Sequence, residues 1–259
     1  MKALLIKVLV CFVAGAGAGI GTGFAGMSAA VVISPMLITF LGVEAYEAVG
    51  IALASDVLAS ALSAWIYHKH GNLDIKDGVV MLITVLIFTL IGSLVSSLMP
   101  DATLGSFSLL MTVFLGIKFL VKPTMTSKEE SHLKPRRQRI IRSIICGCYV
   151  GFVCGFIGAG GGLMILFVLT SILGYDLKTA VGTSVFIMSF TALTGAVSHF
   201  ALGGLTDVES LVFCIVFTLI WARIAARYAN KAAPKTLNVV TGTILCVLGV
   251  AMIAFNYFF

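Results

Sequence analysis

One acidic residue lies deep inside an apolar stretch of the sequence. Asp56 is near the middle of residues 45–67, directly after Ser55. A carboxylate in such a segment is costly to hold ionised, so it is a functional candidate by default. We therefore predict that Asp56 accepts a proton or gates a pathway. The alternative is a protonated carboxyl group that only makes a structural hydrogen bond inside a helix bundle.

Two glycine-rich breaks, residues 15–26 and 155–162, form a second chemical feature. A helix that starts after such a break has unpaired N–H groups and a positive dipole end, which favour an anion. We therefore predict an oxyanion site where the two helix starts meet. The alternative is that small residues only allow close helix packing. The residues predicted to bind the anion are Gly26, Ser28, Ala29, Gly158, Gly160, Gly161 and Gly162, with hydroxyl groups from Ser55, Thr183 and Ser184.

Composition indicates which class of protein must position these residues. The chain has 259 residues, of which 59% are hydrophobic and 11% are charged. Soluble domains carry roughly 25% charged residues, so a soluble fold is excluded, and this hydrophobic content excludes disorder. Runs such as residues 79–94 are apolar on every face, unlike the strands of a membrane β-barrel. The predicted fold class is an all-α integral membrane protein, a polytopic helical bundle in the lipid bilayer.

The two halves of the chain resemble each other. A shift of 132 positions aligns residues 23–73 with 155–205 without a gap, and 13 of these 51 positions are identical. Chance in so apolar a composition would give about four, and internal repeats are common in transporters. Each half contains about five apolar segments, the second of which is a short broken or re-entrant helix. We therefore divide the chain into a first membrane repeat (1–121), a basic linker (122–139) and a second membrane repeat (140–259).

Basic residues indicate how the repeats are oriented. Residues 122–142 contain seven Lys and Arg against two Glu, so the positive-inside rule places this segment in the cytoplasm. Five crossings per half then leave both termini outside and give the repeats inverted topology. Lys2 and Lys7 are exceptions, since they lie near an outside terminus. The loops expected outside, which contain no Lys or Arg, are 42–44, 99–101, 174–176 and 203–207.

Motifs of the second half resemble a known family. The stretch GFIGAGGGLM at 155–164, followed by LGYD at 173–176 and KTAVGTS at 178–184, resembles the sulfite exporter TauE/SafE family. The resemblance covers essentially the whole chain, although the first half has Ser-Ala-Ala at 28–30 in place of the glycine triplet. It implies a duplicated permease of the bacterial inner membrane that moves sulfite or a small organosulfur anion, often by export.

These observations favour a secondary transporter over an enzyme. The sequence contains no GxxxxGK[ST] motif, no CxxC pair, and no acid–base pair or catalytic triad at membrane depth. We therefore predict no catalytic residue, no metal and no cofactor. The basic charge comes mainly from one loop, so no nucleic-acid partner is expected. The predicted function is proton-coupled export of a small sulfur-containing anion. The alternatives are a passive anion channel, because broken helices also line pores, and a non-transporting membrane assembly protein; a homodimer stays open as an oligomeric state.

Overall fold

The structure is a computed structural model, and it describes residues 2–96, 113–114, 117–122, 136–157, 161–203 and 205–258. These residues are almost entirely helical and contain no strand. Five of the helices are long and apolar enough to cross a membrane. Large apolar side chains such as Leu5, Ile145 and Val250 are exposed on the outside of the bundle, as expected for a surface that faces lipid. The predicted all-α polytopic membrane fold is confirmed.

The helices follow one another in the same order in the two halves. The helices of the first half are α1 (Lys2–Ala25), α2 (Ala30–Leu41), α3 (Ala45–Lys69) and α4 (Ile75–Ser96). Those of the second half are α7 (Arg136–Ile157), α8 (Gly161–Phe167) with its π-helical continuation (Val168–Ile172), α9 (Leu177–Gly203), α10 (Val208–Lys231) and α11 (Pro234–Phe258). When shifted by 132 residues, the starts of α2, α3 and α4 fall within one residue of the starts of α8, α9 and α10.

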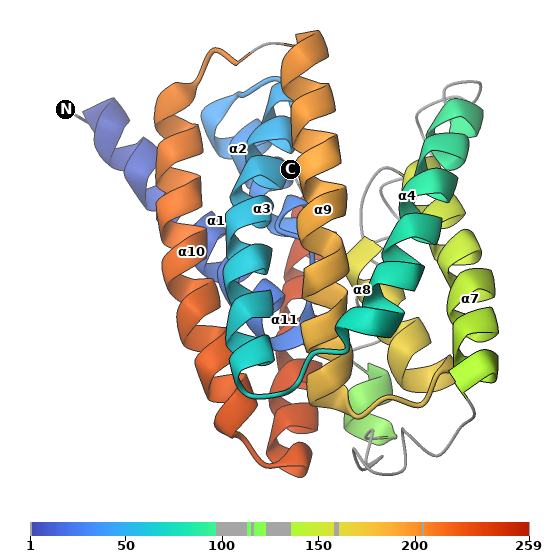
Figure 1. Ribbon diagram of the computed structural model, residues 1–259. Coiled ribbons are helices and arrows are strands. Elements are labelled where there is room, and N and C mark those ends of the chain that lie inside the picture. Colours follow the sequence, from blue (N-terminus) through green and yellow to red (C-terminus); the bar gives the residue numbers. More distant parts are fainter. Residues whose placement is uncertain are drawn as a thin grey trace.

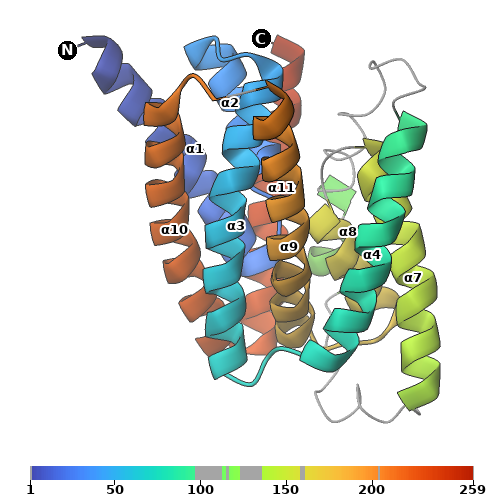
Figure 2. The same ribbon diagram turned by 45° about the horizontal axis from the view of Figure 1, so that its top comes forward.

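The two halves pack crosswise. Helix α1 lies against α10, and its equivalent α7 lies against α4, so the first helix of each half contacts the fourth helix of the other. Helices α3 and α9 pack against each other at the centre. These two equivalent helices run in opposite directions, since α3 begins at the upper end of Figure 1 and α9 at the lower end. Both chain termini lie at the upper end in Figure 2. This arrangement supports the predicted inverted repeats.

The first glycine-rich run does not break its helix, contrary to the prediction. Residues 15–25 belong to α1, and the interruption is confined to residues 26–29. The reason is packing against α10. A Cβ on Gly15, Gly19 or Gly23 would lie 2.5–2.8 Å from atoms of that helix, including the carbonyl oxygens of Thr218 and Ala222. For these three glycines the close-packing alternative is correct, because their missing side chains let the two backbones touch.

Loop 174–176 lies at the opposite end of the bundle from loop 42–44, so the prediction that both loops lie on the outer side is wrong. The Tyr175 hydroxyl lies 3.1 Å from Asp74 Oδ2 and 3.0 Å from Asp77 Oδ2, at the end where α3 passes into α4. Equivalent helices run in opposite directions, and loops at equivalent positions must therefore lie at opposite ends.

The exceptional N-terminal lysine has a structural explanation. Lys7 Nζ lies 2.9 Å from Asp207 Oδ1 and 3.0 Å from Glu209 Oε2 at the start of α10. At the same end, the backbone N–H groups of Thr206 and Asp207 donate to the Glu47 carboxylate at 2.6 and 2.7 Å. In the folded protein the charge of Lys7 is therefore balanced by Asp207 and Glu209, which lowers the cost of holding a lysine at this end of the bundle.

Candidate functional site

The break between α1 and α2 is a tight turn held by one threonine. Gly26 has φ +62°, a left-handed conformation that glycine adopts without strain. Its N–H donates to the Thr22 carbonyl at 2.9 Å, and the Thr22 hydroxyl donates to the Met27 carbonyl at 2.8 Å. The chain therefore leaves α1 and enters α2 within four residues, which places the start of α2 inside the bundle.

Asp56 caps the start of α2. Its Oδ2 accepts the N–H of Ala29 at 3.1 Å, and the side chain is fully buried. The Ser28 side chain also lies beside this carboxylate. Ala29 itself has no side chain that could cap the helix, and a carboxylate at this position is stabilised by the positive end of the helix dipole. The start of α2 thus already faces one negative group, supplied by α3.

The second oxygen of Asp56 has no such partner. Oδ1 is buried and accepts no hydrogen bond in the part of the chain that the structure describes. A buried polar atom without a partner costs free energy. Six other buried side-chain atoms of the described residues share this condition, and Asp56 Oδ1 differs from them in belonging to a carboxyl group at the break. The carboxylate therefore has one oxygen engaged by the backbone and one oxygen able to take a proton.

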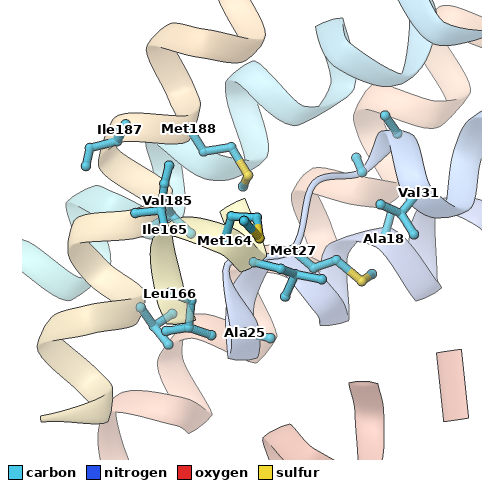
Figure 3. Packing of buried hydrophobic residues seen from close by; sticks show 14 of the residues in the cluster. Ala18, Ala25, Met27, Val31, Met164, Ile165, Leu166, Val185, Ile187 and Met188 are labelled. Atoms are coloured by element: carbon cyan, nitrogen blue, oxygen red, sulfur yellow. The ribbon is translucent and has the colours of Figure 1, made fainter. Parts of the chain in front are cut away.

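The two breaks meet inside the bundle. A Cβ on Gly162, in the first turn of α8, would overlap the carbonyl oxygen of Gly26. A Cβ on Gly26 would in turn overlap the hydroxyl of Ser184 on α9. Met27, Met164 and Met188 belong to the buried apolar cluster around these segments (Figure 3). Backbone touches backbone here, and this contact joins the two halves at the points where their helices are interrupted.

The two helix starts differ in what faces them. Met188 occupies the position in the second half that Asp56 occupies in the first, and its Sδ would lie 2.6 Å from a Cβ on Gly162. The start of α8 therefore faces a thioether where the start of α2 faces a carboxylate. Among the described residues at this place, the carboxyl group comes from the first half alone.

Seven of the predicted site residues that the structure describes gather at this contact, and the hydroxyl groups of the other two, Ser55 and Thr183, make the hydrogen bonds given below. Gly26, Ser28, Ala29, Asp56, Gly162 and Ser184 lie together, with Gly161 beside them. Ser55 donates to the Ile51 carbonyl of its own helix at 2.9 Å. Thr183 accepts the N–H of Asp74 at 3.2 Å, so it contacts the loop between α3 and α4. Gly158 and Gly160 lie outside the described residues.

Sequence reasoning missed residues that hold this site in place. Thr22 fixes the turn, and Tyr67 donates its hydroxyl to the Gly23 carbonyl at 2.9 Å while fully buried. A signal for Thr22 was available, because it is the one polar side chain within the glycine run. Tyr67 gave none, since an aromatic residue near a helix end is equally typical of a membrane interface.

Polar contacts join the two halves at both ends of the bundle. Lys7 and Glu47 bind the segment at 206–209 at one end. At the other end, the Asn72 amide donates to Asn230 Oδ1 at 2.7 Å, and Lys178 Nζ donates to the Asn230 carbonyl at 2.8 Å. Asp56, Ser184 and Met27 between them are fully buried. Within the described ranges, no three His, Cys, Asp or Glu side chains are grouped so that they could hold a metal ion.

Comparisons with known proteins agree with this arrangement. The family model described as sulfite exporter TauE/SafE matches residues 11–252. A protein of Methanocaldococcus jannaschii named "Probable membrane transporter protein" is 25% identical, over 96% of this chain and 94% of its own length. YunE of Bacillus subtilis, with the same description, is 24% identical over 96% of both chains, and YdhB of that organism is 23% identical over 87% of this chain and 90% of its own. No solved structure matches. The match over nearly the whole chain, together with helices able to cross a membrane, makes this protein a multi-pass membrane transporter, and it belongs to the sulfite exporter TauE/SafE family.

Proposed function

We propose that the protein is a secondary transporter that exports a small sulfur-containing oxyanion, such as sulfite or an organosulfonate, across the bacterial inner membrane. The observation that carries the proposal is the direct contact between Gly26 and Gly162, which joins the interrupted helices of the two halves. Discontinuous helices that meet at the centre of a repeat protein are the usual location of a transporter's substrate site. The family description supports the class of substrate.

The anion would be bound mainly by backbone N–H groups. None of the fully buried side chains in the described part of the chain belongs to Lys or Arg. The partly buried Lys118 contacts Thr170, so at the contact between Gly26 and Gly162 we assign the positive potential to the helix starts. Each start is equivalent to roughly half a positive charge. Two of them would balance about one negative charge, which favours a monoanion such as bisulfite or a sulfonate over a dianion. The described residues that we assign to this site are Gly26, Ser28 and Ala29 at the start of α2, and Gly161, Gly162 and Ser184 in the second half. Gly158 and Gly160 complete the proposed set.

Asp56 supplies the proposed coupling to protons. It is the fully buried carboxylate at the contact between the halves, and one of its oxygens lacks a partner there. A carboxyl group at membrane depth that gains and loses a proton is a common element of coupled transporters. We propose that one proton moves with the anion, so that a pH gradient drives transport toward its alkaline side, and export against such a gradient is driven by the outward gradient of the anion itself.

The buried site implies that the halves move relative to each other. Asp56 and Ser184 are closed to solvent while polar contacts join the halves at both ends. An anion would enter when one set of these contacts opens and leave when the other set opens. Crosswise packing of inverted repeats supports such a rocking motion about a fixed site.

Transport into proteoliposomes tests the proposal. Purified protein is reconstituted, a pH gradient is imposed, and accumulation of sulfite, thiosulfate, sulfoacetate and sulfate is measured separately. We expect accumulation of sulfite or a sulfonate above its external concentration, and none when the gradient is collapsed. Equilibration without accumulation would identify a passive channel. No movement of any of the four anions would contradict the proposed substrate class.

A further inference from the structure

We propose that Asp56 competes with the transported anion for the start of α2, and that the anion binds there only when Asp56 is protonated. The inference rests on the proposed function and specifies how proton and anion are coupled. The geometry behind it is the 3.1 Å hydrogen bond from the Ala29 N–H to Asp56 Oδ2. The carboxylate occupies the place that an oxyanion would take at the start of this 12-residue helix.

An ionised Asp56 would exclude the anion. The start of α2 provides roughly half a positive charge, and it already faces the full negative charge of the carboxylate. A second anion at the same N–H groups would place two negative charges against that half charge, in a buried region where repulsion is strong. The site is therefore closed to the substrate while Asp56 is ionised.

Protonation reverses this relation. The proton binds Oδ1, the oxygen that accepts no hydrogen bond from the described residues. The neutral carboxyl group then holds the Ala29 N–H less strongly, because hydrogen bonds to charged groups are roughly twice as strong as neutral ones. Its own O–H can also donate to an oxygen of the anion. One proton thus turns a competitor into a donor, and release of that proton expels the anion.

No charged side chain of the neighbouring helices takes over this role. Helices α1, α2, α9 and α10 pack against α3, and α2 carries no titratable side chain. Lys7 is engaged by Asp207, Lys178 donates to Asn230, and Arg223 and Arg227 are exposed. The other titratable groups on these helices are Lys2, Cys11, His199, Glu209, Cys214, Tyr228 and Lys231. Cys11 and Cys214 contact each other, and the rest lie near helix ends, so Asp56 is the group at the break that can titrate with the substrate.

Binding as a function of pH tests this inference separately from transport. The probe is methanesulfonate, whose single negative charge does not change between about pH 5 and about pH 8, and its affinity is measured on purified full-length protein in detergent. We expect the wild-type affinity to fall as the pH rises, with a limiting slope of about tenfold per pH unit for one linked proton. Asp56→Asn keeps a neutral acceptor for Ala29, and we expect it to bind equally well across this range, more tightly than the wild type at the high end.

Two further variants make the outcome decisive. Asp77→Asn changes a buried carboxylate that bonds to Tyr175, away from the break, and should retain the wild-type pH dependence. Asp56→Glu should retain a pH dependence with altered affinity, which keeps the test valid if the Asn variant fails to fold. A pH dependence that survives in folded Asp56→Asn would overturn this inference and leave the proposed function intact. Absence of wild-type binding at every pH would overturn both for this anion class.

Discussion

The hydroxyl oxygen of Ser184 lies where a Cβ of Gly26 would have to be. This relationship links the first break to α9 and predicts that Gly26→Ala destabilises the protein strongly. The change combines a left-handed conformation, which costs a non-glycine residue about 1–2 kcal/mol, with an overlap that costs about 1–3 kcal/mol more. The measurement is thermal unfolding in detergent, together with anion uptake.

Gly42 provides a matched control for this prediction. It has φ +65°, close to the +62° of Gly26, but a Cβ there would meet nothing within 4 Å. Gly42→Ala should therefore show the conformational cost alone and retain transport. Ser184→Ala should rescue part of the loss in the Gly26→Ala background, since it removes the overlapping oxygen. Equal effects of the two glycine variants would show that the contact with α9 contributes nothing.

A second pair of glycines tests the packing of α1 on α10. A Cβ on Gly19 would lie 2.5 Å from the Thr218 carbonyl oxygen and 2.8 Å from the Ala222 nitrogen, both of which are backbone atoms that cannot move away. A Cβ on Gly17 would lie 3.2 Å from a Val32 methyl group, which can adjust. Alanine is favoured over glycine in a helix by about 1 kcal/mol. We expect Gly17→Ala to be neutral or stabilising and Gly19→Ala to be destabilising in the same unfolding assay.

The ion pair at the start of α10 predicts a loss of stability in acid. Burial alone would raise the pKa of Asp207, but hydrogen bonds from Ser210 and Lys7 outweigh it and hold this pKa below its usual value. A lowered pKa contributes stability that is present above the unfolded-state value of about 4 and is lost as the pH falls through the folded-state value. Asp207→Asn should remove the part of the acid sensitivity that comes from protonation of Asp207. Its amide oxygen should still accept the N–H of Ser210, so the cap at the start of α10 is kept. Glu209→Gln, at a more exposed partner of Lys7, should change it less.

The orientation of the bundle is open to a direct test. We predict that both termini lie outside and that the basic linker at 122–139 is cytoplasmic, because the positive-inside rule and the direction of the equivalent helices agree on this. Reporter enzymes fused after Phe259, and separately inserted into the linker, should report opposite sides. A cytoplasmic signal from the C-terminal fusion would require an even number of crossings in the second half if the linker stays inside.

The long helices could be predicted closely from the sequence. Apolar runs at 45–67, 177–202 and 208–228 correspond to α3, α9 and α10 with the same first residues. The glycine run at 15–25 was read wrongly, because the helix there is stabilised by contact with α10 about 200 residues later, which no local pattern shows. The apolar run at 102–121, which the sequence indicates as the fifth segment of the first half, lies mostly outside the described residues.

The sequence identified residues of the candidate site but not the contacts that they make with one another. Asp56 stood out as an acidic residue in an apolar stretch, and the glycine breaks marked both helix starts. The hydrogen bond between Asp56 and Ala29 joins residues 27 positions apart on different helices, so spacing alone could not reveal it. Ser55 and Thr183 were predicted because hydroxyl groups near a break can face it; their hydrogen bonds, from Ser55 to the Ile51 carbonyl and from the Asp74 N–H to Thr183, could not be deduced from the sequence.

Crosswise packing has a consequence for how the protein is made. Lys7 on α1 meets a partner 200 residues later in the chain, and at about 5–20 residues per second the ribosome delivers that partner about 10–40 s afterwards. During this interval α1 lies in the bilayer with its glycine face uncovered, so the first half cannot complete its own fold. Residues 1–121 expressed alone should be degraded, and supplying residues 122–259 as a separate chain in the same cell should restore their abundance.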